Sequence, residues 1–199
     1  MNRPRASRAP RKVPQAARPV EPLPPPLPLA LLDHPLDYFL SEHHRHRIYL
    51  VGLRQAATAG SVDREVARRL FGFLAVELPL HWADEKIDLL PCLLRLARPE
   101  DGLGDVLARL DADHAASALA VGRIMAGLFE AMMSRQAVLR LDPALRATMQ
   151  AYTTSKSRHL AIENAVVLAI AGVRLRKPDL AAISSAMKVR RVTHHVDHA

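Results

Sequence analysis

Cysteine and aromatic residues are scarce in this sequence, and both shortages narrow the class of protein. The one cysteine, Cys92, excludes an internal disulfide bond and suits a reducing compartment, so we expect a cytoplasmic protein. One Trp, three Tyr and four Phe, with few runs of Val, Ile and Thr, leave little material for a β-sheet. The abundance of Ala, Leu and Arg instead predicts an all-α protein.

Long hydrophobic runs are missing as well. The longest, at residues 165–173, is too short to span a bilayer. Prolines interrupt the Leu-rich part of the N-terminal segment, which therefore lacks the apolar centre of a signal peptide. We accordingly expect no membrane partner.

Acidic residues are outnumbered, but the imbalance lies at the ends of the chain. The formal net charge is +8, of which residues 1–30 contribute +5 and residues 188–199 contribute +2, which leaves about +1 for the rest. Residues 1–30 also hold nine prolines and little to bury, so we expect a disordered Pro/Arg-rich tail. Contact of this tail with nucleic acid or a protein is an alternative that we consider less favoured than a solubilising role. Residues 192–199 should be a frayed histidine-containing tail, and residues 31–191 one domain.

Apolar residues recur with helical spacing over four long stretches and one shorter one, at about residues 35–58, 61–97, 101–133, 142–175 and 178–191. The connections are short, so each helix should turn back along the previous one. The sequence therefore predicts an antiparallel up-down-up-down four-helix bundle with a short extra C-terminal helix. Pro79 and Pro91 fall inside the second stretch, where each should kink the helix or remove a backbone hydrogen bond.

Each long stretch carries a histidine near the middle of its apolar stripe. Two of these histidines are followed four residues later by a glutamate, so that both side chains lie on one face of the helix. The pairs are His81 with Glu85 and His159 with Glu163, and the other two stretches supply His43 and His114. His46 lies on the same stripe as His43, so the first helix offers one or two inward histidines.

Antiparallel helices of similar length bring their middle positions to a similar height, so these six side chains should converge inside the bundle. A metal-free network would have to satisfy two buried carboxylates and four imidazoles by hydrogen bonds alone, although burying an unpaired carboxylate is costly. Imidazole nitrogen and carboxylate oxygen are ligands that suit iron, manganese or zinc. We therefore favour a metal site over a metal-free network.

These residues resemble the ligand motifs of the hemerythrin family, specifically its bacterial hemerythrin-like (HHE) cation-binding domains. The resemblance covers residues 34–175 and consists of His43 within Glu-His-His-Arg, His81-x-x-x-Glu85 followed by Leu-Leu-Pro, His114, and His159-x-x-x-Glu163 followed by Asn. It implies a non-haem centre of two iron ions per chain. Glu85 and Glu163 would bridge the ions, and the four histidines would be terminal ligands.

The sequence departs from the oxygen-carrying members of that family in the third helix. Those proteins have two histidines four residues apart, whereas the positions that flank His114 at this spacing are Leu110 and Ala118. The resemblance thus leaves two alternatives: one metal position is open to water, or His46 replaces the missing ligand. An acid one turn beyond Glu85, Asp88, is either an outer group of the site or, as we favour, a solvated surface residue.

Three classes of function follow from such a site. We favour a binding protein that binds or senses dioxygen, nitric oxide or iron over a di-iron oxidase or peroxide-consuming enzyme, because no clear acid–base group stands out beside the ligands. The remaining alternative is an interaction module whose metal site is structural. The Glu-x-x-His pairs of ferritin-like proteins and the His-Glu-x-x-His motif of zinc proteases are both absent.

Overall fold

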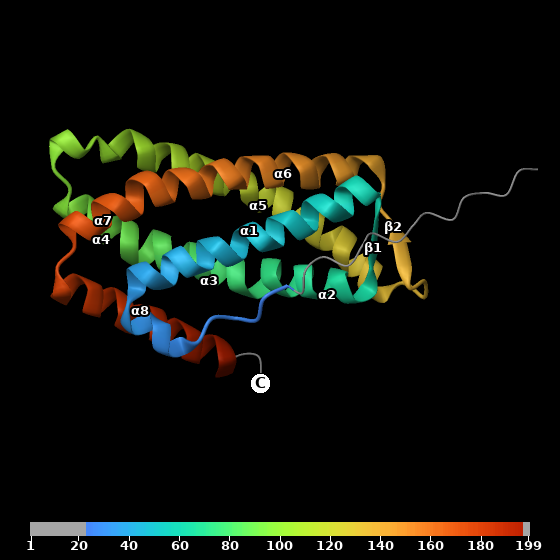
Figure 1. The fold of residues 1–199 in the computed structure, drawn as a ribbon, viewed down its shortest axis with the longest axis horizontal. Helices are drawn as coiled ribbons and strands as arrows, with labels where there is room; N and C mark the ends of the chain where they lie inside the picture. The colour runs from blue at the N-terminus through green and yellow to red at the C-terminus, as the bar shows by residue number, and fades with distance from the viewer. Residues whose placement is uncertain (1–22, 197–199) are drawn as a thin grey trace, which may run out of the picture.

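The structure is a computed structural model that describes residues 23–196. Nearly all of this part of the chain is helical, which confirms the prediction of an all-α protein (Figure 1). The helices are α1 (Pro35–Ala59), α2 (Arg64–Gly72), α3 (Leu78–Ala83), α4 (Leu90–Leu96), α5 (Leu103–Met133), α6 (Pro143–Ile162), α7 (Leu168–Arg174) and α8 (Lys177–Val196). Short 3-10 turns lie at Leu29–Asp33 and Pro99–Asp101.

Local sequence signals explain where these helices begin and end. Asp63 and Asp142 act as N-caps, because their carboxylates accept hydrogen bonds from the backbone N–H groups of Val66 and Leu145 at 2.8 and 2.9 Å. Helix α1 ends at Gly60, which adopts a left-handed conformation with φ of 70° and donates its N–H to the carbonyl of Ala56. A residue with a side chain would be strained at that position.

The second and fourth predicted stretches are continuous but contain wider π-helical turns. These π segments are Phe73–Glu77, Asp84–Leu89 and Glu163–Val167. Pro79 and Pro91 each occupy the second position of the α-helix that follows a π segment. Because proline has no N–H, it leaves the carbonyl four residues earlier without its usual helical hydrogen bond, as we predicted. In the structure, the wider π turn before each proline accommodates this missing bond. No proline lies in the helix that follows the π segment at Glu163–Val167, and nothing in the sequence predicted this segment.

Two three-residue strands close one end of the molecule. Strand β1 (Ser61–Asp63) pairs antiparallel with β2 (Val138–Arg140), and Ser61 lies opposite Arg140. The pair joins the α1–α2 connection to the α5–α6 connection (Figure 1). We had assigned residues 61–63 to the start of a helix and residues 138–140 to a simple connection, because strands this short carry no readable alternation.

Buried apolar side chains form two separate clusters, one toward the β1–β2 end and one toward α8. Along α1, Phe39 belongs to the cluster near α8 and Leu50 to the cluster near the strands, with His43 and His46 between them. Along α5, His114 similarly separates Leu110 from Val121. The polar residues therefore lie between two apolar regions that hold the helices together on both sides.

Helix α8 is longer than the short extra helix that we predicted to end at residue 191. It continues to Val196, so residues 192–196 are helical and not a frayed tail. Figure 1 shows α8 turning back from one end of the molecule and running along the side of the other helices. Arg191 anchors it, because its guanidinium is buried and lies over the ring of Tyr38, 4.8 Å from the ring centroid.

The predicted disordered tail ends earlier than residue 30. Leu23 is buried in the apolar cluster near the strands, and the carbonyl of Pro24 accepts hydrogen bonds from Tyr49 and Arg45 at 3.2 and 3.3 Å. Residues 23–30 thus pack on α1, because Leu23 supplies apolar surface and the proline carbonyl finds donors. The expectation for residues 1–22 lies outside the described residues, as does that for residues 197–199.

Helix α5 is long and apolar enough to cross a membrane, by length and composition alone. This single helix is weak support for a span, because the core helix of a water-soluble domain passes the same test.

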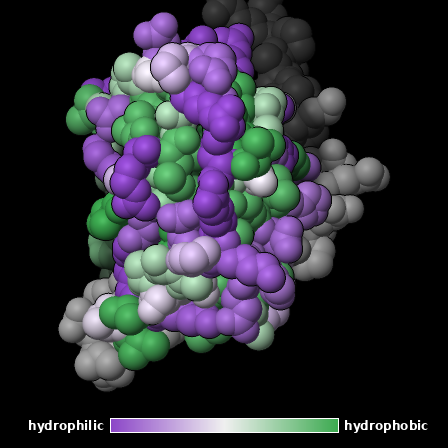
Figure 2. All heavy atoms as spheres, turned by 90° about the vertical axis from the view of Figure 1, so that its left-hand side faces the viewer, coloured by the Kyte–Doolittle hydropathy of each residue, from purple (hydrophilic) through white to green (hydrophobic). Residues whose placement is uncertain are grey.

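At the end of the molecule where α4, α7 and α8 meet, hydrophilic residues run in bands between hydrophobic ones (Figure 2). Arg174 and Asp101 form a two-bond ion pair, at 2.6 and 2.8 Å, between α7 and the turn before α5.

Candidate metal centre

The six side chains singled out in the sequence lie together in the interior, and all six are buried. They form two groups, in each of which one nitrogen or oxygen atom per residue lies within 4.8 Å of the others. One group is His43, His81, Glu85 and Glu163, and the other is His114, His159, Glu85 and Glu163. The two glutamates belong to both groups.

Each glutamate presents one carboxylate oxygen to each pair of histidines. Oε1 of Glu85 lies 3.1 Å from Nε2 of His81 and 3.5 Å from Nε2 of His43, while its Oε2 lies 3.5 Å from Nε2 of His114. Oε2 of Glu163 lies 3.6 Å from Nε2 of His43, while its Oε1 lies 2.5 Å from Nε2 of His159. A carboxylate that faces two ligand groups in this way has the geometry of a bridge between two cations.

The π segments position both glutamates. Glu85 is the second residue of Asp84–Leu89, and Glu163 is the first residue of Glu163–Val167. A π turn widens the helix locally and shifts the direction of the side chains that follow, which is why such turns occur often at functional sites. Both glutamates therefore lie where the helix departs from regular geometry.

Three of the four histidines, His43, His81 and His159, use their other ring nitrogen to contact an outer layer of polar groups. Nδ1 of His43 lies 2.5 Å from Oδ1 of Asn164, and Nδ1 of His81 lies 2.9 Å from Oε2 of Glu42. Nδ1 of His159 lies 3.5 Å from a carboxylate oxygen of Asp113. In His43 and His81, the hydrogen bond at Nδ1 fixes the ring so that Nε2 points inward as a ligand.

Behind Glu42, a buried ion-pair network ties α8 to the centre. Arg191 lies 2.7 Å from Asp84 and 3.4 Å from Glu42. Arg190 pairs with Asp84 and lies 2.8 Å from Asp88. Our interpretation of Asp88 as a solvated surface acid is therefore wrong, because an arginine from a helix distant in sequence covers it. Although burial disfavours the guanidinium of Arg191, the carboxylate of Asp84 outweighs it and raises the pKa.

The charges inside the centre suit replacement of a proton by a cation. Burial disfavours the imidazolium of His81, but the carboxylates of Glu85 and Glu42 outweigh it and raise the pKa to about 10. Burial likewise disfavours the Glu85 carboxylate, yet His81 and His43 hold its pKa well below the usual value. In the metal-free protein the His81 proton thus provides the positive charge that a metal ion would provide.

The ligand atoms that face the centre are not used in hydrogen bonds elsewhere in the described part of the chain. The inward Nε2 atoms of the four histidines and one oxygen of each glutamate are buried without a hydrogen-bond partner in the described part of the chain. Buried polar atoms are nearly always satisfied, so a converging set of unsatisfied donors and acceptors needs an explanation. Metal coordination explains all of them together, and these buried His/Glu groups can hold a metal ion.

A scan against protein-family models finds no match for this chain, and a search of curated proteins finds none either. Support for the centre therefore comes from the chain's own geometry.

His46 is buried but belongs to neither ligand group. Its ring packs against that of His81, with centroids 4.4 Å apart, and against Phe73 at 4.9 Å. Of the two positions that flank His114, Leu110 is buried and Ala118 is exposed. An inward ligand at Ala118 is thus excluded by the direction of its side chain.

Sequence reasoning assigned no role to the outer layer. Glu42 directly precedes the ligand His43, and Asn164 directly follows the ligand Glu163. Adjacent residues of a helix point in different directions, so this proximity in sequence did not predict a contact with the centre. Asp113 lies beside His114 yet contacts His159 of another helix. Such cross-helix contacts depend on how the helices dock, which no local pattern encodes.

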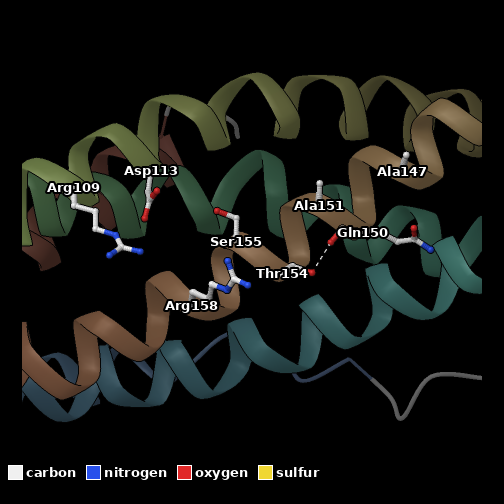
Figure 3. Close-up of a pocket in the computed structure, with 8 residues that line it drawn as sticks. All are labelled: Arg109, Asp113, Ala147, Gln150, Ala151, Thr154, Ser155 and Arg158. Carbon is white, nitrogen blue, oxygen red and sulfur yellow. Dashed lines mark hydrogen bonds between the residues drawn. The ribbon is translucent and has the colours of Figure 1, made fainter.

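An open hollow of about 530 Å³ lies between α5 and α6 (Figure 3). Asp113 lines it, as do Arg109 and Arg158, whose side chains point into the hollow from the two helices. Because Asp113 also approaches Nδ1 of His159, only one side chain separates this hollow from a candidate ligand.

Proposed function

We propose that this protein is a hemerythrin-like protein that holds two non-haem iron ions. Glu85 and Glu163 would bridge the ions, His43 and His81 would complete one ligand set, and His114 and His159 the other. The observation that carries this proposal is that each glutamate directs its two oxygens at different histidine pairs. Iron is favoured over zinc because structural zinc sites are usually closed by four protein ligands and do not share bridging carboxylates.

The arrangement of the helices supports the same proposal. The four ligand-bearing stretches are α1, α2 to α4, α5, and α6 to α7, as expected of an up-down-up-down bundle. His43 contacts Asn164 while Arg146 donates to the carbonyl of Ala57, so α1 and the α6–α7 stretch run in opposite directions. The additional helix α8 covers the side of the centre at Glu42 and Asp84.

The function that we infer is reversible binding or sensing of a small ligand, such as dioxygen or nitric oxide, at the iron ions. Each metal would have two histidines and two shared carboxylate oxygens, which leaves coordination positions open for water or an exogenous ligand. Among residues 23–196, the buried acid–base groups without a hydrogen-bond partner outside the ligand set are few, chiefly His46 and Lys156, so catalysis of an oxidation is less well supported. Iron would supply the ligand-binding chemistry, and the chain would position the ions between its two apolar clusters.

Elemental analysis of protein purified without a histidine tag tests the metal. We expect about two iron atoms per chain in the unmodified protein. His81→Ala and Glu163→Ala should each lose at least one of them, because Glu163 serves both ligand groups. His44→Ala, which removes an exposed histidine of α1, is the matched control and should retain both. Retention of both iron atoms in His81→Ala and Glu163→Ala would show that the ligands are misassigned.

Titration of the reduced protein with nitric oxide, followed by absorption, tests the function. Ligand binding at an open iron position should change the spectrum and reverse when the gas is removed. A metal-loaded protein whose spectrum does not respond would favour a structural metal site.

A further inference from the structure

Helix α5 has an apolar face that the described part of the chain leaves uncovered. The helix packs on α2 and α6, and its buried face includes His114 and Ile124. In its most apolar stretch of 18 residues, however, only 28% are buried. Three large apolar side chains of α5, Leu119, Phe129 and Met133, are 74%, 51% and 69% exposed. Exposed apolar side chains that gather on one face of a protein mark an interaction surface.

These three residues belong to a longer stripe along α5. Its members recur at alternating spacings of four and three residues and are all exposed: Ala108, Ala112, Ala115, Leu119, Gly122, Ala126, Phe129 and Met133. This spacing keeps side chains on one side of a helix, and it is the repeat with which two helices pack along their length. The α5 stripe, as we call these eight residues, is about 38 Å long at a rise of about 1.5 Å per residue.

Gly122, in the middle of the α5 stripe, is not required by the fold of a single chain. A β-carbon added at Gly122 would meet no described atom within 4 Å, whereas one added at Gly127 would collide with the side chain of Leu145. Glycine inside a helix is destabilising relative to alanine, and its use is to let another group come close. Gly122 is therefore suited to a close approach from outside the chain.

The sizes of its side chains make the α5 stripe complementary to a reversed copy of itself. The small residues Ala108, Ala112 and Ala115 occupy its N-terminal part, whereas Phe129 and Met133 lie at its C-terminal end. Two copies of α5 that run antiparallel about a two-fold axis between residues 120 and 121 would pair large residues with small ones. The layers would be Met133 with Ala108, Phe129 with Ala112, Ala126 with Ala115, and Leu119 with Gly122. A parallel pair would instead place large residues opposite each other and leave gaps between the alanines.

Charged residues beside the α5 stripe favour the same arrangement. Arg109 and Glu130 are exposed, and each directly follows a residue of the stripe, so both lie along the same edge of it. In the antiparallel register Arg109 of one copy faces Glu130 of the other, and the two-fold axis generates this pair twice. Arg123, on the same edge, would face Ala116. A parallel pair would bring each charge against its own like charge.

We propose that the α5 stripe is a docking surface for a second copy of this chain, with which it forms an antiparallel, two-fold symmetric dimer. A second copy is favoured over a lipid surface because alanine and glycine, at five of the eight positions, offer little apolar area to lipid but let two helices approach closely. One helix from each copy makes a smaller contact than an obligate dimer has, so the dimer should exchange with the monomer. This inference does not depend on the metal or its ligands.

Sedimentation equilibrium of the unmodified protein should show a reversible mixture of monomer and dimer. Gly122→Leu should raise the dissociation constant at least about tenfold, because the new side chain would meet Leu119 of the other copy. Gly104→Leu is the matched control on the same helix: a β-carbon there also meets no described atom within 4 Å, but the position lies off the stripe. Circular dichroism should show that both variants fold, since the space around both positions is open. An unchanged dissociation constant in Gly122→Leu would overturn the proposal.

Charge reversal tests the pairing at the edge of the stripe. Glu130→Arg should raise the dissociation constant several-fold, because it would face Arg109 of the other copy. The double variant Arg109→Glu/Glu130→Arg should return the constant to within about twofold of the original value. A double variant that dimerises as weakly as Glu130→Arg would refute the antiparallel register.

Disulfide cross-linking tests the direction of the two helices. In a Cys92→Ser background, a mixture of Ala115→Cys and Ala126→Cys proteins should cross-link under mild oxidation, because these positions face each other. Either protein alone should not, since its two cysteines would lie about 16 Å apart along the helices. Cross-linking of either protein alone would indicate a parallel pair and refute the proposal. An unmodified protein that stays monomeric at every concentration would also refute it, and binding of that monomer to phosphatidylcholine vesicles would identify lipid as the occupant.

Discussion

The carboxylate of Glu42 lies 2.9 Å from Nδ1 of His81, on the ring nitrogen opposite the one that faces Glu85. His81 is therefore held between two carboxylates from different helices. This contact fixes which nitrogen of His81 points into the centre, and it links the centre to Arg191 through the other oxygen of Glu42.

Glu42→Gln should weaken metal binding without abolishing it. The amide oxygen can still accept a hydrogen bond from His81, but it no longer makes the ring a stronger ligand, so we expect a loss of about tenfold in affinity. Competition with a chelator of known affinity measures the change. Glu77→Gln is the matched control, because Glu77 pairs with Arg45 on the same side of the molecule and does not contact a histidine. Equal affinities for the two variants would mean that Glu42 has no influence on His81 as a ligand.

The metal-free protein should lose stability as the pH rises from about 6.5 to about 10. The pKa of His81 is raised from 6.5 to about 10 in the folded state, so its proton is bound more tightly there than in the unfolded chain. That stabilisation is complete below the unfolded pKa and disappears as the pH passes through the folded one. Urea unfolding of chelator-treated protein at several pH values measures it. In iron-loaded protein the metal replaces the proton, so the same pH range should have a smaller effect, and identical slopes would contradict this account.

Arg191→Met should destabilise the protein by roughly 3 kcal/mol, because it leaves the buried carboxylates of Asp84 and Glu42 without a partner that they share. Denaturant unfolding gives the value. Lys188→Met removes an exposed charge from the same helix and should have little effect. The double variant Asp84→Asn/Arg191→Met should recover part of the loss, since one uncompensated charge is gone. No recovery would point to packing on Tyr38 as the main contribution of Arg191.

Only one of the two positions that flank His114 can supply another ligand. Leu110 is buried and Ala118 is exposed, so Leu110→His should add an inward imidazole and change the absorption of the iron-loaded protein. Ala118→His should leave the absorption unchanged, because its ring would lie in solvent. A spectral change in Ala118→His alone would show that α5 is rotated relative to the arrangement described above.

Deletion of residues 1–30 should be more harmful than deletion of residues 1–22. The longer deletion removes the buried Leu23 and the carbonyl of Pro24 that accepts hydrogen bonds from Tyr49 and Arg45, which together contribute about 2 kcal/mol. The shorter deletion should leave melting temperature and iron content unaltered. Equal melting temperatures for both truncated proteins would show that residues 23–30 contribute nothing.

The helices and the six inner residues could be predicted from the sequence because both depend on local spacing. A histidine and a glutamate four residues apart share a face in any helix, and proline, aspartate and glycine mark where helices begin and end. Even so, an apolar residue within a predicted helix need not be buried, and Leu40 of α1 is 45% exposed. The buried face is narrower there than the apolar pattern suggested.

The outer residues could not be predicted, because their contacts join segments that are distant in the chain. Lys156 looks like an ordinary surface residue of a helix, and only the docking of α1 and α5 buries it. Arg191 belongs to a helix whose position against Asp84 is set by tertiary packing. The π turn at Glu163–Val167 has no proline or glycine to announce it.

The pairing of Asp84 with Arg191 also has a consequence for how the protein is made. The two residues are 107 positions apart, so Asp84 leaves the ribosome long before Arg191 has been synthesised. Until then, a nascent chain that closed around Asp84 would enclose an uncompensated negative charge. The first helices should therefore stay loosely associated during synthesis, and a metal ion should enter the centre only after Arg191 has been synthesised.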